Sequence, residues 1–277
     1  MSGLEETAVH NNWAFLAPQP GQMAPNWWEP GRVHIDIESD ALHLAAEQPL
    51  RVLSSAVLGA GLRDSHHVLN FQVEADYART DPENDIASRL KRRGICPDDA
   101  LALMTAVRLA DASYVVAKGD GWDILTVVTC GFRNAASVAD FLSDGRPDDR
   151  QRVWTVGTIN IISVVHGWLT DGALVNAVMT ATEAKTAALV ALGVRTRPAN
   201  NWATGTTSDA IVIGCDQFAN AHQVTYTGLA TPFGQALAQT VYHGVLDSGV
   251  KYRDRLQTSS VASRVGDVNF RNVTGRS

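Results

Sequence analysis

The feature that most constrains the fold is a strand–helix–strand pattern over residues 158–215. Residues 158–165 (TINIISVV) are mostly β-branched, residues 171–192 carry the longest helical pattern, and residues 209–215 (DAIVIGC) form an apolar run of strand length. A strand, a helix and a second strand in this order form a crossover unit, whose two strands run parallel in one sheet. The pattern therefore predicts a parallel pair of strands with a helix packed on it.

A hairpin pattern adds antiparallel pairing. Residues 113–117 and 122–130 are rich in β-forming side chains and flank the turn sequence KGDG at 118–121. Further strands are expected at 33–37, 41–46, 51–58 and 67–74, and helices at 82–93, from Pro97 onward and at 233–246. Since both kinds of connection occur, we expect a single α+β domain with a mixed or mainly antiparallel sheet packed with helices.

Composition divides the chain into a body and two flanks. With 277 residues, 45% of them hydrophobic, the chain is long enough for one globular core. Residues 1–45 form a Trp- and Pro-rich arm with a first hairpin, residues 46–248 form the body, and residues 249–277 carry six Lys or Arg against two Asp, a net charge of +4. We expect the flanks to supply subunit contacts or to gate the substrate, and we expect a homodimer from base rates.

Charge and cysteine usage argue against several classes of protein. A net charge of −6 gives no positive field for nucleic acid, and no apolar window is long enough to span a membrane. The first 20 residues lack the pattern of a secretory signal, so a cytoplasmic protein is expected. Cys96, Cys130 and Cys215 have neither disulfide nor zinc-site spacing, and the eight histidines show no repeated ligand spacing. We therefore predict neither a metal nor a cofactor, and we expect Cys130 and Cys215 to be buried.

Four polar stretches follow or precede apolar strands. They lie at 129–135, 157–160, 204–210 and 225–231 and combine Gly, Thr and Asn with an occasional acid. Such loops bring backbone N–H groups and hydroxyls close to a ligand, so we expect the four to share one polar cleft. The candidates for substrate binding are Asn134, Thr158, Gly205, Thr206, Thr207 and Tyr226 from these stretches, with Ser55 in the expected strand 51–58 and His166 after the strand 158–165. His166, which follows the 158–165 strand, is also the best-placed histidine for a general base.

A fifth polar stretch lies inside the long expected helix. Residues 180–186 (TATEAKT) place threonines and charged residues in an alanine-rich segment, and the β-branched threonines run against helix propensity. Glu183 and Lys185 are two positions apart, so they point about 200° apart on a regular helix and one of them is expected to be solvated. The sequence leaves open which one.

The chain lacks the common catalytic motifs, yet seven stretches in order resemble a known family. No G-x-S-x-G elbow, phosphate loop, H-E-x-x-H or G-x-G-x-x-G motif occurs. The family that the chain resembles is that of the adenosylcobinamide amidohydrolases, the CbiZ type. The stretches are 53–61 (LSSAVLGAG), 105–107 (TAV), 129–135 (TCGFRNA), 157–160 (GTIN), 182–189 (TEAKTAAL), 204–209 (TGTTSD) and 226–228 (YTG), the last followed by Thr231 and Gly234. Cys130 and the Pro232-Phe233 pair depart from the family pattern, and the two flanks lie outside the resemblance.

The resemblance implies hydrolysis of the amide that links the aminopropanol arm of adenosylcobinamide to the corrin. The products would be adenosylcobyric acid and aminopropanol or aminopropanol phosphate, as in cobinamide salvage. Two alternatives remain open at this point: a hydrolase of a different amide or a cyclic imide, and a protein that binds a corrinoid without turning it over.

Amide hydrolysis needs a nucleophile, donors for the tetrahedral oxyanion and a proton for the leaving amine. Without a metal motif or a recognisable triad, a carboxylate base or an activated hydroxyl must supply the nucleophile. The catalytic candidates are Glu183, as the first choice of base, Asp209 as the second, and Lys185 and Asn160 as donors to the oxyanion. Trp168, Trp202 and the tryptophans of the arm are candidates to line the cleft.

Overall fold

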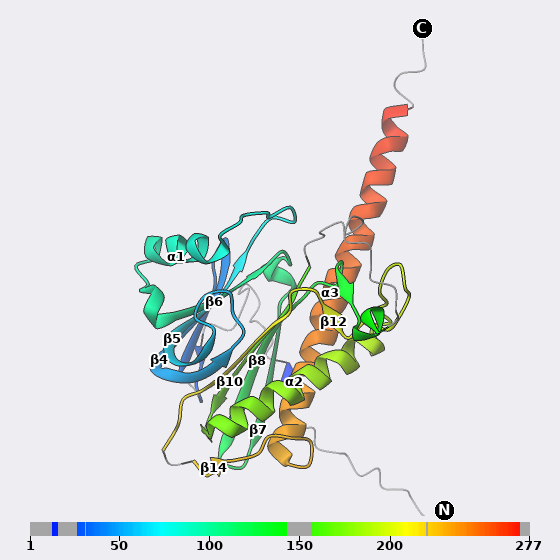
Figure 1. The fold of residues 1–277 in the computed structure, drawn as a ribbon. Helices are drawn as coiled ribbons and strands as arrows, with labels where there is room; N and C mark the ends of the chain where they lie inside the picture. The colour runs from blue at the N-terminus through cyan, green and yellow to red at the C-terminus, as the bar shows by residue number, and fades with distance from the viewer. Residues whose placement is uncertain (1–12, 16–26, 31, 143–156, 220, 272–277) are drawn as a thin grey trace, which may run out of the picture.

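A large mixed sheet folds back on itself and carries helices on its two outer faces (Figure 1). The computed structural model describes residues 13–15, 27–30, 32–142, 157–219 and 221–271. The strands of the large sheet are β1 (Trp13–Phe15), β2 (Trp27–Trp28), β3 (Val33–Ile37), β4 (Ala41–Ser54), β5 (Gly61–Gln72), β6 (Ala100–Thr105), β7 (Ser113–Gly119), β8 (Trp122–Cys130), β10 (Ile159–His166) and β13 (Ala210–Cys215). Their order is β1-β7-β8-β10-β13-β4-β3-β2, with β5 between β4 and β6.

Three α-helices and several short elements complete the described chain. The α-helices are α1 (Pro82–Arg92), α2 (Asp171–Ala191) and α3 (Pro232–Arg271), and the 3₁₀ turns are η1 (Pro97–Asp99), η2 (Leu109–Asp111) and η3 (Val138–Phe141). Two small sheets join β9 (Ala135–Ala136) with β12 (Gly205–Thr206) and β11 (Trp168–Leu169) with β14 (Gln223–Val224). Within the described residues, none of the helices combines the length and the apolar composition of a membrane span.

The crossover unit and the hairpin are both confirmed, and with them the α+β class. Strands β10 and β13 pair parallel, with Asn160 opposite Ala210 and Val165 opposite Cys215, and α2 connects them. Strands β7 and β8 form the antiparallel hairpin around Asp120 and Gly121, where Gly121 has the positive φ (76°) that this turn favours.

Three apolar cores separate the layers. The first lies between the central strands and the two helices α2 and α3, and includes Ile161, Ala177 and Leu237. The second lies between the two halves of the folded sheet, where Leu103 of β6 packs with Ile162 of β10. The third lies between α1 and the outer side of β5 and β6. The fold is therefore a four-layer arrangement of helix, sheet, sheet and helices, in which β10 is covered on both faces.

The helix expected from Pro97 onward is wrong. Pro97–Asp99 form one 3₁₀ turn, and the chain continues as β6, which pairs parallel with β5. Leu101 and Leu103 face the core between the sheet halves, while Ala100 and Ala102 face α1. Because β6 is buried on both sides, its sequence lacks the alternation that marks a half-exposed strand. The last helix is also much longer than the expected 233–246, since it runs from Pro232 to Arg271.

Aromatic side chains attach the described parts of the N-terminal arm to the body. Trp13 in β1 stacks on His243 of α3 at 3.7 Å between ring centroids, and Trp28 in β2 is buried in the core between the sheet halves. Burial lowers the pKa of His243. Trp28 is therefore a core residue and does not line a cleft, which corrects the expectation for this tryptophan. The rest of the arm, residues 1–12 and 16–26, lies outside the described residues.

Candidate active site

Helix α2 positions the basic residue at the centre of the candidate site. The helix begins after Thr170, whose Oγ1 accepts the N–H of Ala173 at 3.1 Å. A row of small side chains packs on the sheet and allows α2 to approach it closely; these are Ala173, Ala177, Ala181, Ala184 and Ala188. Lys185 lies at the edge of this buried face, and its side chain reaches the loop that precedes β13.

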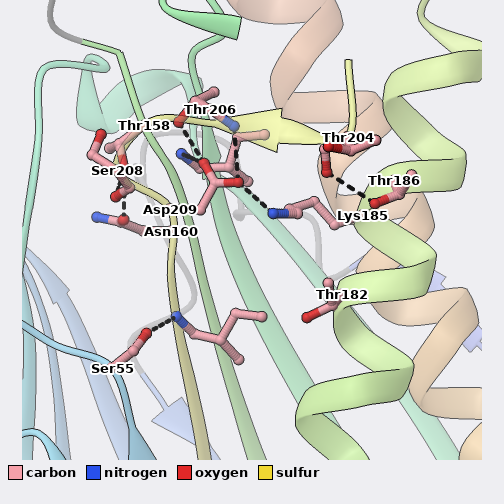
Figure 2. Close-up of polar contacts among 12 residues, drawn as sticks. Ser55, Thr158, Asn160, Thr182, Lys185, Thr186, Thr204, Thr206, Ser208 and Asp209 are labelled. Carbon is pink, nitrogen blue, oxygen red and sulfur yellow. Dashed lines mark hydrogen bonds and ion pairs between the residues drawn. The ribbon is translucent and has the colours of Figure 1, made fainter. Parts of the chain in front are cut away.

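Lys185 forms a nearly buried ion pair with Asp209 (Figure 2). The side chains are 8% and 11% exposed. Asp209 accepts three further hydrogen bonds, from the N–H of Ile159 (3.1 Å), the N–H of Thr206 (3.0 Å) and the hydroxyl of Thr206. Four donors hold the carboxylate in one orientation and occupy its lone pairs. Asp209 is therefore placed to hold the Lys185 ammonium, which donates to no other acceptor among the described residues and keeps two further N–H donors.

Gly205 lets the chain pass directly over this ion pair. It belongs to β12, which pairs antiparallel with β9. A Cβ at this position would lie 2.8 Å from Nζ of Lys185 and 2.5 Å from Oδ2 of Asp209. Both separations are shorter than ordinary van der Waals contacts, so a side chain here would displace the pair. The residue type at 205 is thus explained by close approach to the two charged groups.

Three of the four polar stretches come together at the Ile159 end of β10. The Oγ1 of Thr158 donates to the carbonyl of Ser208 (2.7 Å), and Nδ2 of Asn134 donates to Oγ1 of Thr207 (2.7 Å). Residues 129–135, 157–160 and 204–210 therefore share one side of the molecule, as the sequence predicted. Thr158 is buried, Asn134 is half-buried and Thr207 is exposed, so the stretches reach the surface mainly through Thr207 and its neighbours.

Asn160 lies inside the molecule, between the two halves of the sheet. It is 1% exposed, and its Nδ2 donates to Oδ1 of Asn70 (2.8 Å) and to the carbonyl of Met104 (2.9 Å). Asn70 in turn donates to Oγ1 of Thr129 at 3.0 Å. With both N–H groups used inside the protein, Asn160 has no donor left for a ligand. Asn70 was not among the sequence candidates, although one amide in the apolar run 68–71 (VLNF) is the kind of signal that marks a buried polar network.

Two hydroxyls lie on the other side of the ion pair, toward the surface. Ser55 follows the end of β4, is exposed, and its Oγ accepts the N–H of Ile211 at 3.0 Å. Thr182 lies one turn before Lys185 on α2, and Figure 2 shows its hydroxyl pointing from the helix toward the side on which Ser55 lies. The Thr182 hydroxyl donates to the carbonyl of Val178 at 2.8 Å.

Of the two charged residues on α2, Glu183 is the solvated one. It is exposed, and no ion pair or hydrogen bond to its side chain occurs among the described residues, whereas Lys185 is buried. The two side chains leave the helix about 200° apart, as their spacing requires. The first-choice base of the sequence therefore lies away from the ion pair, on the solvent face of α2.

The fourth polar stretch and His166 lie at the opposite end of β10. His166 Nδ1 pairs with Asp216 at 2.5 Å, and the hydroxyl of Thr227 donates to the carbonyl of Ala173, at the start of α2. Tyr226 is exposed there and lines a surface pocket of about 520 Å³ with Trp122 and Phe233. His166 is seven positions after Ile159, a strand length of about 23 Å. The expectation of one shared cleft is therefore corrected for 225–231 and for His166.

Two buried thiols are placed for packing, as predicted. Cys130 and Cys215 are free and buried, and Cys96 is free and exposed. Burial raises the pKa of Cys130, with a further increase from the charge of Asp209, and burial raises the pKa of Cys215 to about 12. A thiol with a raised pKa is a poor nucleophile at neutral pH. Among the described residues, no three His, Cys, Asp or Glu side chains are grouped so that they could hold a metal ion.

Comparisons with known proteins agree with the sequence resemblance. Residues 29–257 match the family model described as adenosylcobinamide amidohydrolase, a match wider than the seven stretches. An adenosylcobinamide amidohydrolase of Halobacterium salinarum is 31% identical over 228 residues, which cover 82% of this chain and 91% of that protein. A second, from Methanosarcina mazei, is 27% identical over 198 residues, 69% of this chain and 86% of that protein. An uncharacterized protein of Methanocaldococcus jannaschii is 30% identical over 186 residues, 62% of this chain and 69% of that protein.

Proposed function

The chain belongs to the adenosylcobinamide amidohydrolase (CbiZ) family, and from this membership we propose that it cleaves the amide between the corrin and the aminopropanol arm of adenosylcobinamide. Water adds to the amide carbonyl and the C–N bond breaks. The corrin side leaves as adenosylcobyric acid, and the arm leaves as aminopropanol or its phosphate after its nitrogen takes a proton. The family match over residues 29–257 is the observation that carries this proposal.

The ion pair of Lys185 and Asp209 is the proposed centre of the reaction. Negative charge develops on the amide oxygen as water adds, and a fixed cationic donor in a water-poor site lowers the energy of that state. Lys185 is such a donor, because Asp209 fixes its ammonium and leaves two N–H groups unused within the described structure. We assign oxyanion stabilisation to Lys185 and the positioning of Lys185 to Asp209, with Thr206 and Gly205 completing the support.

Exposed apolar side chains on α2 and on the segment that follows β4 fit a large and partly apolar substrate. Val175 and Met179 on α2 are 55% and 56% exposed, and both precede Thr182 on the outer side of the helix. Val57, two residues after Ser55, is 40% exposed. Contact of a corrin edge with these side chains would remove apolar surface from water on both partners. Ser55 and Asn134 are proposed to bind the polar groups of the same substrate.

The base remains assigned to Glu183 only as a prediction, since its place on the solvent face of α2 does not support the assignment. The test begins with purified protein, adenosylcobinamide and mass spectrometry of the products. We expect adenosylcobyric acid from the wild type. Product formation by Glu183→Gln at the full rate would remove Glu183 from the mechanism. Binding of the corrinoid without product would instead favour a carrier or sensor. Hydrolysis of another amide or of a cyclic imide, but not of adenosylcobinamide, would favour a hydrolase with a different substrate.

A further inference from the structure

Thr182, one helical turn before Lys185, presents a hydroxyl that can accept a hydrogen bond. Its proton is committed within the helix, because Oγ1 donates to the carbonyl of Val178 at 2.8 Å. No donor to this oxygen occurs among the described residues, and the residue is exposed, so its lone pairs face outward unused. The position lies one turn before Lys185, on the same side of α2.

The hydroxyl of Ser55 and the ammonium of Lys185 offer hydrogen-bond donors, in contrast to the acceptor of Thr182. The Oγ of Ser55 accepts the N–H of Ile211 at 3.0 Å, and its own proton has no acceptor among the described residues. Lys185 likewise keeps two N–H donors beyond the one given to Asp209. In Figure 2 the hydroxyl of Thr182 points from α2 toward the side on which Ser55 lies, and Lys185 leaves the helix one turn further along. The site therefore offers two sources of donated protons and one acceptor.

A secondary amide has the matching pattern. Its carbonyl oxygen accepts hydrogen bonds, and its N–H, on the other side of the C–N bond in the trans form, donates one. An ester of the same shape offers the carbonyl but lacks the N–H. A site with a dedicated acceptor for that N–H therefore discriminates between the two, since the ester would leave the acceptor without a partner.

We propose that Thr182 accepts the N–H of the scissile amide and makes the site selective for a secondary amide over an ester. The proposal rests on the proposed function, because it takes the amide carbonyl to lie at Lys185. The β-branched residue in the alanine-rich helix is explained by the same role: Thr182 supplies the acceptor, and its bond to Val178 fixes the direction of the lone pairs.

The experiment compares two substrates across two variants. The substrates are adenosylcobinamide and an analogue in which an oxygen replaces the N–H of the linking amide; the variants are Thr182→Val, which keeps the shape, and Thr182→Ser, which keeps the hydroxyl. We expect Thr182→Val to lower kcat/KM for the amide about 5- to 10-fold, the effect of one lost neutral hydrogen bond, and to change the ester rate less than about 2-fold. Thr182→Ser is expected to retain most of the selectivity.

The outcomes separate this proposal from the proposed function. Equal losses on amide and ester in Thr182→Val, or no loss on either, would overturn the role of Thr182 while leaving the hydrolase activity in place. If the wild type binds adenosylcobinamide without cleaving it, the affinities of the wild type and of Thr182→Val for adenosylcobinamide test the contact instead. An equal affinity in the two proteins would overturn the proposed hydrogen bond from the amide N–H to Thr182. A wild type that neither binds nor cleaves the corrinoid would overturn both proposals. Thermal denaturation of each variant confirms that it is folded.

Discussion

Two aspartates bracket strand β13. They make the same kind of contact with the neighbouring strand, but the groups that surround them differ. Asp209 precedes the strand and accepts the N–H of Ile159, while Asp216 follows the strand and accepts the N–H of Gly167. The parallel register of β10 and β13 produces both contacts, because each end of one strand lies beside the matching end of the other. Each carboxylate also pairs with a nitrogen group, Lys185 at one end and His166 at the other.

The two ends differ in what surrounds the pair. At the first end the partner comes from helix α2, the side chains are 8% and 11% exposed, and the hydroxyls of Ser55 and Thr182 lie nearby. At the second end the partner comes from β10 itself, the side chains are 23% and 13% exposed, and Phe218 packs on the imidazole at 4.5 Å. A strand-end aspartate is thus a structural feature at both ends, and the proposed chemistry depends on the groups that α2 adds at one of them.

A substitution that crowds the first end should have a large effect. Gly205→Ala places a methyl group within 2.8 Å of Nζ of Lys185. We expect kcat/KM for adenosylcobinamide to fall about 100-fold, because the displaced ammonium no longer meets the amide oxygen. The matched control is Gly172→Ala in the first turn of α2, where the nearest atom to the new Cβ is 3.9 Å away and the rate should not change. Equal rates for the two variants would contradict the account.

The buried amide network below the first end offers a test of stability. Asn160→Ala leaves Oδ1 of Asn70 and the carbonyl of Met104 without their donor, so we expect a loss of about 2 kcal/mol in the free energy of unfolding. Asn70→Ala should lower the free energy of unfolding by a similar amount. The double variant should lose less than the sum of the two single losses, because the two side chains share one hydrogen bond. At the second end, Tyr226→Phe, on an exposed ring, should change the free energy of unfolding by less than about 0.5 kcal/mol. Urea unfolding measures all four, and additive losses would argue against a shared network.

A histidine pair away from both ends makes stability depend on pH. Burial lowers the pKa of His43 to about 4, with a further decrease from His67, its hydrogen-bond partner at 3.1 Å, while the carboxylates of Glu38 and Asp36 oppose the shift. Between pH 6.5 and 4 the unfolded chain therefore binds more protons than the folded one, and stability falls as the pH is lowered through this window. His43→Gln should reduce this dependence, measured by urea unfolding at several pH values. An unchanged dependence would show that His43 does not carry it, and the exposed His222→Gln is the control.

The parts of the fold that depend on local pattern could be predicted from the sequence. The crossover unit and the hairpin at Asp120 and Gly121 follow from strand and turn chemistry that neighbouring residues determine. Strand β6 could not be predicted, because burial on two faces removes the alternation that marks a strand. Its single-turn start at Pro97–Asp99 resembles the start of a longer helix.

The candidate site was predictable as a set of residues but not as an arrangement. Lys185, Asp209 and Thr206 were all candidates, and the structure brings them into contact. Which of Glu183 and Lys185 is buried depends on which side of α2 packs on the sheet, and an alanine-rich helix shows little apolar asymmetry in its sequence. The separation of Tyr226 from this group reflects the length of β10, which joins similar polar loops at its two ends.

The most direct test of the account measures the rate of adenosylcobyric acid formation after substitution at each end of β10. Lys185→Met should lower kcat/KM about 100- to 1,000-fold, the usual effect of removing a donor to an oxyanion, with Lys185→Arg less impaired because the charge remains. His166→Gln should stay within about 3-fold of the wild type, since it lies about 23 Å along the strand from the proposed reaction. A folded Lys185→Met variant with wild-type rate, or a larger loss in His166→Gln than in Lys185→Met, would contradict the placement of the active site.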